Sequence, residues 1–547
     1  MGPTSSEQGG LPNSPRSQEQ DPLSPAPSPA GGPSISRTAQ TRIARAAGQV
    51  MLLFVLSRLL GLAREMIIGA RFGTSAELDA YLAAFRLPDL IFQLVAGGAL
   101  GSAFIPTFTA HLTKDDRAAA WRLASAVINL VLLLLTLVAL LAALFARPLV
   151  AQVIAPGFPP AQQALTAQLL RGLLISTVIF GVSGIVMGVL NSFQHFLAPA
   201  LAPAIYNLGI IAGAWWLAPR WGVRGLVAGV VAGAAGHLLV QLPALARRRP
   251  RYLPTLGLRQ PDVREVARLM GPRVLGLAVV QINFLVNTIL ASGLAEGSLA
   301  ALNYAWLLML LPQGVVAQGI ATAAFPTFSA LAARGEQAEM RATFSATLRA
   351  ILVLSIPASA GLFVLRLPLI RLLLERGAFS AASTAAVAYA LAFFSWGLVA
   401  HAAVEIAARA FYALHDTLTP VLIGLGTIAL NIVLSLALLR PLQHGGLALA
   451  NTVATGLEMV VLLALLRRRL GGLQGRRVGR AALRAALASG VMALPLAALL
   501  ARWPAAPPLL LGGGGILLGG AIYLLGMAAL RSEELRMLPA LLRRRQR

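Results

Sequence analysis

Four ionisable residues lie within one short apolar stretch, SRLLGLAREMIIGARFG at residues 57–73. They are Arg58, Arg64, Glu65 and Arg71. An arginine at the centre of a membrane-spanning helix costs about 2.5–3.5 kcal/mol on insertion scales. A guanidinium group can bind two oxygens of one phosphate at once. The stretch therefore indicates a site for an anionic phosphate group within a membrane helix.

Internal pairing is the alternative for these charges. Arg58 and Glu65 are seven residues apart and share a helical face, and Arg64 could pair with Asp79, so that the charges would hold a helix bundle together. Ionisable groups deep in a span usually line a pathway. We therefore favour substrate binding for Arg58 and Arg64, with Glu65 and Asp79 as counter-charges when the site is empty.

Further polar residues fall in later apolar segments. His401, Glu405 and Arg409 recur every four residues and form one stripe on a helix, and Asn283 and Asn287 form a similar pair. Such groups either line a cavity or hold helices together. The possible cavity-lining residues are Ser57, Asn283, Asn287, His401, Glu405, Arg409 and Asp416.

The sequence offers no constellation of residues for catalysis. We find no P-loop and no metal-ligand spacing among its scattered histidines, and there are no cysteines. This excludes disulfides and thiol chemistry. We predict a transporter rather than an enzyme, with no metal site and no cofactor.

Membrane helices must position these polar residues. The chain has 547 residues, of which 57% are hydrophobic and 12% charged. Apolar runs of about 20 residues recur, which is the length that crosses a hydrocarbon core of ~30 Å. We predict an all-α polytopic membrane protein with about 14 transmembrane helices. The expected spans are 48–70, 79–108, 121–146, 162–189, 197–218, 224–245, 263–291, 299–330, 344–365, 382–410, 418–439, 445–466, 481–501 and 507–530, and residues 366–381 are the most ambiguous connection.

Arginine placement predicts the orientation. Clusters at residues 247–268, 467–480 and 543–547 all fall on one face when the spans are counted in this way. The positive-inside rule makes that face cytoplasmic, with both termini inside. Topology therefore explains the net charge of +25, and we expect no binding to nucleic acid. Arg71 and Arg86 are expected to snorkel to the membrane surfaces.

Pieces of the first half of the chain recur in the second. RLLGLA at 58–63 resembles RVLGLA at 273–278, and AFIPTF at 103–108 resembles AFPTF at 324–328. Chance similarity between Ala/Leu-rich helices is the alternative, but the shared order and the matching Pro and Gly positions favour a repeat. We predict two six-helix lobes in parallel repeat plus two extra C-terminal helices, an arrangement in which transporters place their site between the lobes. The expected division is a disordered cytoplasmic tail (1–40), an N-lobe (41–246), a basic cytoplasmic connection (247–268), a C-lobe (269–468), helices 13–14 (469–530) and a basic cytoplasmic tail (531–547).

The run SRLLGLAREMIIGARFGTSAELDAYLAAFRLPDL, followed by GGALGSAFIPTF, closely resembles the start of the MurJ (MviN) family. The stretches LPQGVVAQGIATAAFPTFSALAA, LLERGAFS and AFYALHDTLTPV agree, and the resemblance covers about residues 45–530. These are lipid II flippases of the multidrug/oligosaccharidyl-lipid/polysaccharide exporter superfamily. The resemblance implies fourteen helices, a central cationic cavity and alternating access in the bacterial inner membrane.

The resemblance also implies roles for individual residues. Arg58 and Arg64 match first-helix arginines that engage the diphosphate in the family, Glu65 matches the acidic residue that follows, and Asp79 matches an aspartate before the second helix. The last two helices, within residues 469–530, would form a groove for the lipid tail.

This chain departs from the family pattern at several positions. The family usually carries charges at the positions of Phe92, Gln93, Gly97 and Leu307, and some members bind sodium with an aspartate at the position of Asn287.

We therefore predict a flippase that moves lipid II, an undecaprenyl-diphosphate-linked peptidoglycan precursor, from the inner to the outer leaflet. The expected partners are lipid II or a related polyprenyl-diphosphate glycan, and membrane lipids. We expect a monomer, with cell-wall synthesis proteins as possible partners. Coupling to the membrane potential or to sodium stays open. The alternatives are a flippase for another polyprenyl-diphosphate-linked glycan, a multidrug-type cation transporter, which the arginines disfavour, and a non-transporting membrane scaffold of the same fold.

Overall fold

A computed structural model describes residues 37–94 and 103–535 of the chain, which are helices and connecting turns without a strand. The all-α prediction is confirmed. Contacts divide the chain into residues 1–49 and 50–547. Within the described residues, ten helices are long and apolar enough to cross a membrane. The expected count of fourteen spans therefore stays a prediction.

The first helix, α1 (Arg37–Phe72), begins earlier than expected. A disordered tail was predicted for residues 1–40. Residues 1–36 lie outside the described residues, and residues 37–40 are helical. The helices and short π-helical turns that follow are α2 (Ala76–Phe92), α3 (Ile105–Thr113), α4 (Arg117–Leu144), α5 (Ala146–Leu149), η3 (Val150–Ile154), α6 (Pro160–Ser192), α7 (Leu197–Ala212), η4 (Gly213–Leu217), α8 (Ala218–Trp221), α9 (Val223–Leu239) and α10 (Leu242–Ala246).

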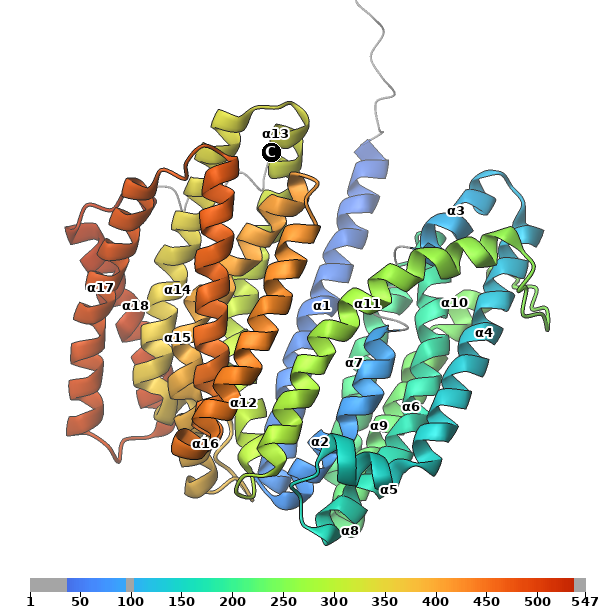
Figure 1. Ribbon diagram of the computed structural model, residues 1–547, viewed down its shortest axis with the longest axis horizontal. Coiled ribbons are helices and arrows are strands. Elements are labelled where there is room, and N and C mark those ends of the chain that lie inside the picture. The colour runs from blue at the N-terminus through green and yellow to red at the C-terminus, as the bar shows by residue number, and fades with distance from the viewer. Residues whose placement is uncertain (1–36, 95–102, 536–547) are drawn as a thin grey trace, which may run out of the picture. The chain divides into compact units, whose positions relative to one another are not determined.

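The second half of the chain is also made of helices and short π-helical turns (Figure 1). Its elements are α11 (Pro261–Ser292), α12 (Ser298–Gln313), η5 (Gly314–Gln318), α13 (Gly319–Ala333), α14 (Gln337–Leu373), α15 (Ala381–Ala413), α16 (Leu418–Arg469), α17 (Gly475–Arg502), η6 (Leu509–Gly514) and α18 (Gly515–Ala529). The ambiguous connection 366–381 is now assigned, because α14 runs on to Leu373 and Ser380 caps α15 with its hydroxyl. The spans expected at 418–439 and 445–466 form the two parts of α16, which is kinked at Gln443, where φ is 50°.

Local sequence explains where several helices begin. The Ser75 hydroxyl accepts a hydrogen bond from the Leu78 N–H at the start of α2, and the Asp116 carboxylate accepts one from the Ala119 N–H at the start of α4. Both residues satisfy a helix N–H group that would otherwise lack a partner. Pro261 opens α11, a position where its missing N–H is not needed.

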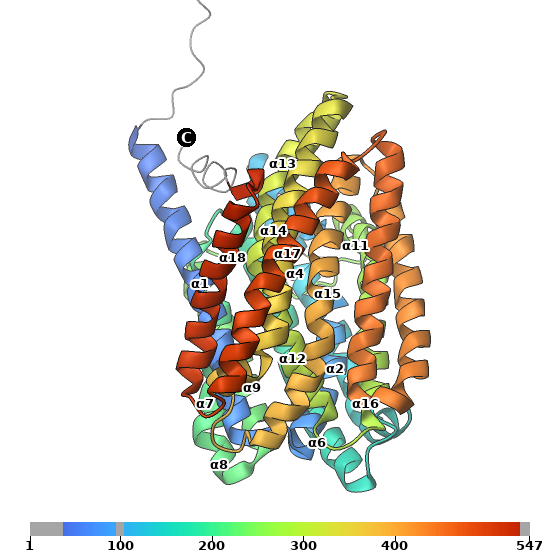
Figure 2. The ribbon, with the colours of Figure 1, turned by 90° about the vertical axis from the view of Figure 1, so that its left-hand side faces the viewer.

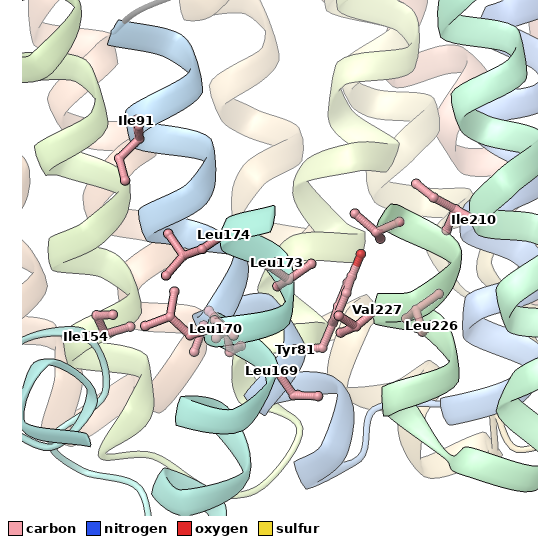
Figure 3. Close-up of a cluster of buried hydrophobic side chains, with 14 of the residues drawn as sticks. Tyr81, Ile91, Ile154, Leu169, Leu170, Leu173, Leu174, Ile210, Leu226 and Val227 are labelled. Carbon is pink, nitrogen blue, oxygen red and sulfur yellow. The ribbon is translucent and has the colours of Figure 1, made fainter. Parts of the chain in front are cut away.

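A buried apolar cluster joins α2, α6 and α9. Leu169, Leu170, Leu173 and Leu174 extend from α6 into this cluster, and Figure 3 shows the Tyr81 ring of α2 between α6 and α9. All of these side chains are buried. The packing of these side chains therefore fixes α2, α6 and α9 against one another.

Four glycines allow α7 and its π-helical extension to approach α9. A Cβ atom on Gly209 would lie 2.3 Å from the Cα of Gly233, and one on Gly213 would lie 2.5 Å from the Cα of Gly229. Small residues four apart permit this close backbone packing in membrane helices.

The outward-facing residues of α4 between Leu132 and Leu144 are apolar. Leu133, Leu137, Leu140 and Leu144 are exposed along this helix, and their spacing places them on one face. A contiguous leucine face of this kind is unfavourable in water and suits contact with lipid.

Helices from both halves of the chain meet around α2 and α11. In the first half α6 contacts α2, α4 and α9, and in the second half α15 contacts α12, α14 and α16. Between the halves, α2 contacts α11 and α12. Figures 1 and 2 show α17 and α18 beside α14. The proposed division into lobes and tails stays a prediction.

Candidate binding cavity

A cavity of about 490 Å³ lies among α1, α2, α6, α7, α9 and α12. Phe85, Phe92 and Phe180 form part of its apolar wall. Its polar lining residues are Arg64, Glu65, Tyr81, Arg86, Asp89, Ser176, Thr177, Tyr206, His237, Asn303 and Tyr304. The cavity thus combines two guanidinium groups and two carboxylates, whose formal charges balance, with an apolar surround.

Arg64 is held from two sides. Its Nη2 lies 2.5 Å from Oε1 of Glu65, and its Nη1 donates to Oδ1 of Asn207 on α7 at 3.0 Å. The Asn207 amide in turn donates to the backbone carbonyl of Ser57 at 3.3 Å. A guanidinium has five N–H donors, so Arg64 keeps donors for a ligand in the cavity.

Arg86 also reaches the cavity rather than the membrane surface. Its Nε donates to the Thr288 hydroxyl of α11 at 3.0 Å, and its guanidinium lies 5.6 Å from the centre of the Phe284 ring. The snorkelling prediction was therefore wrong for Arg86. Arg71 is exposed in the last turn of α1, and its snorkelling stays a prediction.

Arg58 and Arg64 are not brought together. Arg58 is exposed and stacks over the Phe54 ring at 5.4 Å, whereas Arg64 lines the cavity. The alternative pairs Arg58–Glu65 and Arg64–Asp79 do not form in the described part of the chain. Substrate binding by these residues stays a prediction.

Asp79 lies outside the cavity, where it joins α2 to α12. Its carboxylate oxygens accept hydrogen bonds from the backbone N–H groups of Gly297 and Ala300, both at 2.7 Å. The carboxylate thus caps the positive end of α12. Asp79 is a buried contact between two halves of the chain in this conformation.

Further contacts close the same end of the molecule, and we call them together with Asp79 the seal. The Ala378 N–H donates to the carbonyl of Ala70 at 2.7 Å, and the Thr74 and Ser383 hydroxyls lie 2.9 Å apart. A Cβ on Gly377, where φ is +61°, would lie 2.2 Å from the carbonyl oxygen of Ala70. Only glycine permits this approach.

The polar stripe of α15 is engaged within the protein. His401 lies 3.1 Å from Oδ1 of Asn451, and Glu405 pairs with Arg409 at 2.8 Å. Arg409 also donates to the Thr322 hydroxyl at 2.7 Å. None of these residues lines the cavity described above.

Asp416 lies in the turn between α15 and α16. Its carboxylate accepts hydrogen bonds from the Thr419 hydroxyl at 2.6 Å and from the Thr419 N–H at 3.0 Å. Arg469 lies 2.6 Å from the same group. The hydrogen bonds from Thr419, aided by the Arg469 charge, hold the pKa of Asp416 below its usual value. This geometry is that of a helix cap and an ion pair.

Two residues of the site, Asn207 and Tyr304, were not predicted from the sequence. Asn207 was not singled out, although it is a polar side chain within an apolar span. Tyr304 also lines the cavity, and its buried hydroxyl has no hydrogen-bond partner among the described residues. The only local signal for either residue was a polar group in an apolar helix.

Two asparagines of α11 lie where the resemblance implies a sodium site in some members of the family. Asn283 and Asn287 each present a buried Oδ1 atom without a partner in the described segments. These oxygens are neutral, whereas the sodium site implied by the resemblance uses an aspartate at position 287. Coupling to sodium therefore stays open, and no group of three His, Cys, Asp or Glu residues suited to a metal occurs in the described ranges.

Comparison with known sequences assigns the family. The sequence profile described as "Lipid II flippase MurJ" matches residues 68–506. The chain belongs to the MurJ family. The lipid II flippase MurJ of Burkholderia cenocepacia is 32% identical over 425 residues, which are 76% of this chain and 82% of that protein. The family expected from the sequence motifs is confirmed.

Solved structures agree on the fold. The structure titled "Lipid II flippase MurJ, inward closed conformation" has a TM-score of 0.75 and 24% identity, and the match covers 88% of this chain and 98% of that one. An inward-facing multidrug resistance MATE family transporter of the MOP superfamily has a TM-score of 0.66 and 16% identity, with 77% and 96% covered. The chain thus has the MurJ fold, which is similar to that of MATE transporters.

Three of the departures from the family motif can be placed, and one of them, Gln93, is half-buried at the end of α2. Phe92 lines the cavity and packs against Phe180, with ring centres 5.3 Å apart. Leu307 is half-buried on α12. Gly97 lies outside the described residues. An aromatic pair therefore occupies part of the cavity wall where the resemblance implies a charged residue.

Proposed function

We propose that this chain is a flippase that carries lipid II from the inner to the outer leaflet of the bacterial inner membrane. The observation that carries the proposal is the Arg64 guanidinium, held by Glu65 and Asn207 inside a cavity among membrane helices. A diphosphate headgroup is the part of the substrate that matches this guanidinium. Membership of a family of lipid II flippases supports the same substrate.

Binding would proceed by exchange of ion partners at Arg64. In the empty cavity Glu65 neutralises Arg64. An incoming diphosphate would compete with this carboxylate for the guanidinium, because phosphate also accepts two parallel N–H bonds. Asn207 would meanwhile hold Nη1 in place and keep the guanidinium directed towards the cavity.

Alternating access would then depend on opening the seal. Its contacts through Asp79, Ala70 and Thr74 close one end of the cavity-forming helices. Release of the substrate on that side requires these hydrogen bonds to break, while contacts at the opposite end form. The N-lobe and the C-lobe would move relative to each other in this step.

We propose that the sealed end faces outward and that both termini are cytoplasmic. The arginines of residues 247–268 and 467–480 favour this orientation. Since the chain has no cysteine, a single introduced thiol can report the side of the membrane. An impermeant thiol reagent should label Arg220→Cys and Arg440→Cys in intact cells, and should not label Arg334→Cys. The reverse pattern would invert the orientation.

We further propose that transport needs no cofactor and is driven by the membrane potential. The sodium site that the resemblance implies uses an aspartate where this chain has Asn287, so we do not expect that form of coupling here. The partners would be lipid II and membrane lipids, with a monomer as the working unit and cell-wall synthesis proteins as neighbours. Flipping in vesicles should therefore respond to an imposed potential and not to replacement of sodium by potassium.

Complementation tests the proposed function. Bacteria depleted of their own lipid II flippase should be rescued by the wild-type chain and by Arg224→Ala, which removes an exposed arginine outside the cavity. Arg64→Ala should fail, and Arg64→Lys should rescue weakly because lysine keeps the charge without the fork. Membrane levels of each variant are measured in parallel. Full rescue by Arg64→Ala at equal levels would refute the role of the cavity.

A further inference from the structure

A second hollow of about 550 Å³ lies on the outside of α1, and we call it the arginine groove. Met66 and Ile67 of α1 form its apolar floor, and Trp215 of η4 lies on one side. Arg71, at the end of α1, and Arg376, in the turn after α14, supply its charged groups. The groove therefore combines two guanidiniums with an apolar and aromatic wall.

The groove is separate from the Arg64 cavity. Arg64, Glu65 and Ile68 line the cavity, whereas Met66 and Ile67, on another face of the same helix, line the groove. Thus α1 forms a wall between the two hollows. A ligand in the groove would contact the protein without entering the cavity.

The two arginines of the groove carry charge that the protein does not neutralise. Within the described ranges neither Arg71 nor Arg376 lies within ion-pair distance of a carboxylate. Glu375, next to Arg376, is engaged by Arg371 at 3.6 Å and by the Thr384 hydroxyl at 2.6 Å. Arg376 donates to the carbonyl of Leu372 at 2.6 Å, which uses Nη2 and leaves its other nitrogens available.

The charged end of the groove lies at helix ends rather than at mid-helix. Arg71 is in the last turn of α1, and Arg376 lies between α14 and α15. Trp215 is 64% exposed and Trp216 is 69% exposed. Exposed tryptophans mark the headgroup level of a membrane. The guanidiniums therefore lie where lipid phosphates lie, and the apolar floor continues along α1 towards the lipid interior.

We propose that the arginine groove binds an anionic phospholipid through its phosphate, with the upper part of an acyl chain over Met66 and Ile67. Charge complementarity carries the assignment. Two unneutralised guanidiniums provide paired N–H donors for phosphate oxygens, and the apolar floor favours a ligand that also carries an apolar part. In the orientation proposed above, this lipid belongs to the outer leaflet.

Such a lipid would also stabilise the seal. Arg71 and Arg376 come from two segments far apart in the sequence, and these segments already meet where the Ala378 N–H donates to the Ala70 carbonyl. A phosphate between the two guanidiniums would link the segments a second time. A ligand that binds only this arrangement raises its stability by mass action.

Titration with defined lipids tests the proposal. The full-length protein in neutral detergent is titrated with phosphatidylglycerol, with phosphatidylcholine as the zwitterionic reference, while the melting temperature is followed. Phosphatidylglycerol should raise the melting temperature of the wild type. In Arg71→Gln/Arg376→Gln its apparent affinity should fall by about tenfold or more, since two charge-assisted contacts are removed. The matched control Arg220→Gln/Arg440→Gln loses the same charge at exposed sites and should behave as the wild type.

Quenching of tryptophan fluorescence keeps the test decisive if the double variant fails to fold. Bromine-labelled phosphatidylglycerol should quench the wild type more than Trp215→Phe, because only Trp215 lines the groove among the described tryptophans. Equal titrations of the double variant and its control, or equal quenching, would overturn the proposal. An equal rise in melting temperature with soluble pyrophosphate would assign the groove to a free anion instead. Loss of a dimer in the double variant would assign it to a second copy.

Discussion

Arg64 shows how a charged residue is accommodated in an apolar helix. Its neighbour Glu65 neutralises it, and Asn207 accepts a further hydrogen bond. A buried charge with a partner and hydrogen bonds costs far less than an isolated one. The pair remains partly exposed to the cavity, with 27% of the Arg64 side chain and 14% of the Glu65 side chain accessible. The ion pair is therefore open to exchange with an anionic ligand.

Two buried tyrosines should respond differently to loss of their hydroxyl groups. The Tyr304 hydroxyl has no partner in the described part of the chain, whereas the Tyr523 hydroxyl donates to the carbonyl of Val353 at 2.6 Å. Tyr304→Phe should leave the stability of the protein unchanged or slightly raised. Tyr523→Phe should lower it by about 1–2 kcal/mol. Thermal unfolding in detergent measures both, and a larger loss for Tyr304→Phe would indicate a bound water or other partner.

At the scale of elements, the start of α2 is joined to the start of α12 by a side chain. The carboxylate of Asp79, near the start of α2, satisfies two N–H groups at the start of α12. The first N–H groups of a helix have no partner within the helix. An aspartate that supplies partners from a different helix therefore links the two elements through their backbones.

Removing this charge should weaken the seal. Asp79→Asn keeps the shape of the side chain, but its amide nitrogen cannot accept a hydrogen bond, so we expect a loss of stability of about 2 kcal/mol. A thiol introduced at Thr74 should also become more reactive in this background, because the sealed end opens more often. Glu77→Gln, an exposed change on the same helix, is the control. Unchanged stability and reactivity in Asp79→Asn would rule out a role in closure.

The turn between α15 and α16 should confer a pH dependence. Hydrogen bonds from Thr419 and the charge of Arg469 lower the pKa of Asp416 from its usual value of about 3.9. Folding then favours the ionised carboxylate, and this stabilisation is complete above about pH 4 and is lost as the pH falls through the lowered pKa. Melting temperatures of wild type and Asp416→Asn should differ at pH 7 and converge as the pH falls through the lowered pKa. A constant difference across this range would contradict the linkage.

In the whole molecule, an ion pair attaches the C-terminal helices to α14. Arg349 donates to Glu534 at 2.8 Å, and both side chains are only 6% exposed. The Ser532 hydroxyl donates to the other oxygen of Glu534 at 2.7 Å. Part of the predicted basic tail, 531–547, is therefore packed on α14, whereas residues 536–547 lie outside the described residues. This contact adds to the apolar packing between α14 and α17.

Breaking this pair from one side should be costly. Arg349→Met leaves Glu534 buried without its cation, and we expect a loss of about 3–5 kcal/mol. The double variant Arg349→Met/Glu534→Leu removes both charges and should regain most of that stability. Unfolding by heat or denaturant measures the stability of the wild type, of Arg349→Met and of the double variant. If the double variant is as unstable as the single one, packing rather than charge explains the loss.

Sequence patterns were sufficient for the helical class, the family and the placement of Arg64 in a polar cavity. Each of these depends on local information. Apolar runs identify membrane helices because lipid forces every backbone group to bond within its own segment. The motif around Arg64 is contiguous, and one helix presents both Arg64 and Glu65.

Tertiary structure alone decided which polar groups meet. Arg64 bonds to Asn207, and Asp79 bonds to the start of α12, across separations of 143 and 221 residues. Arg86 was misread as a surface residue because its partner Thr288 lies on a helix from the other half of the chain. In an apolar environment a buried polar group must find a partner. Helical periodicity in the sequence specifies only the face of the helix on which that polar group lies. The packing of helices that are distant in sequence decides which residue becomes the partner.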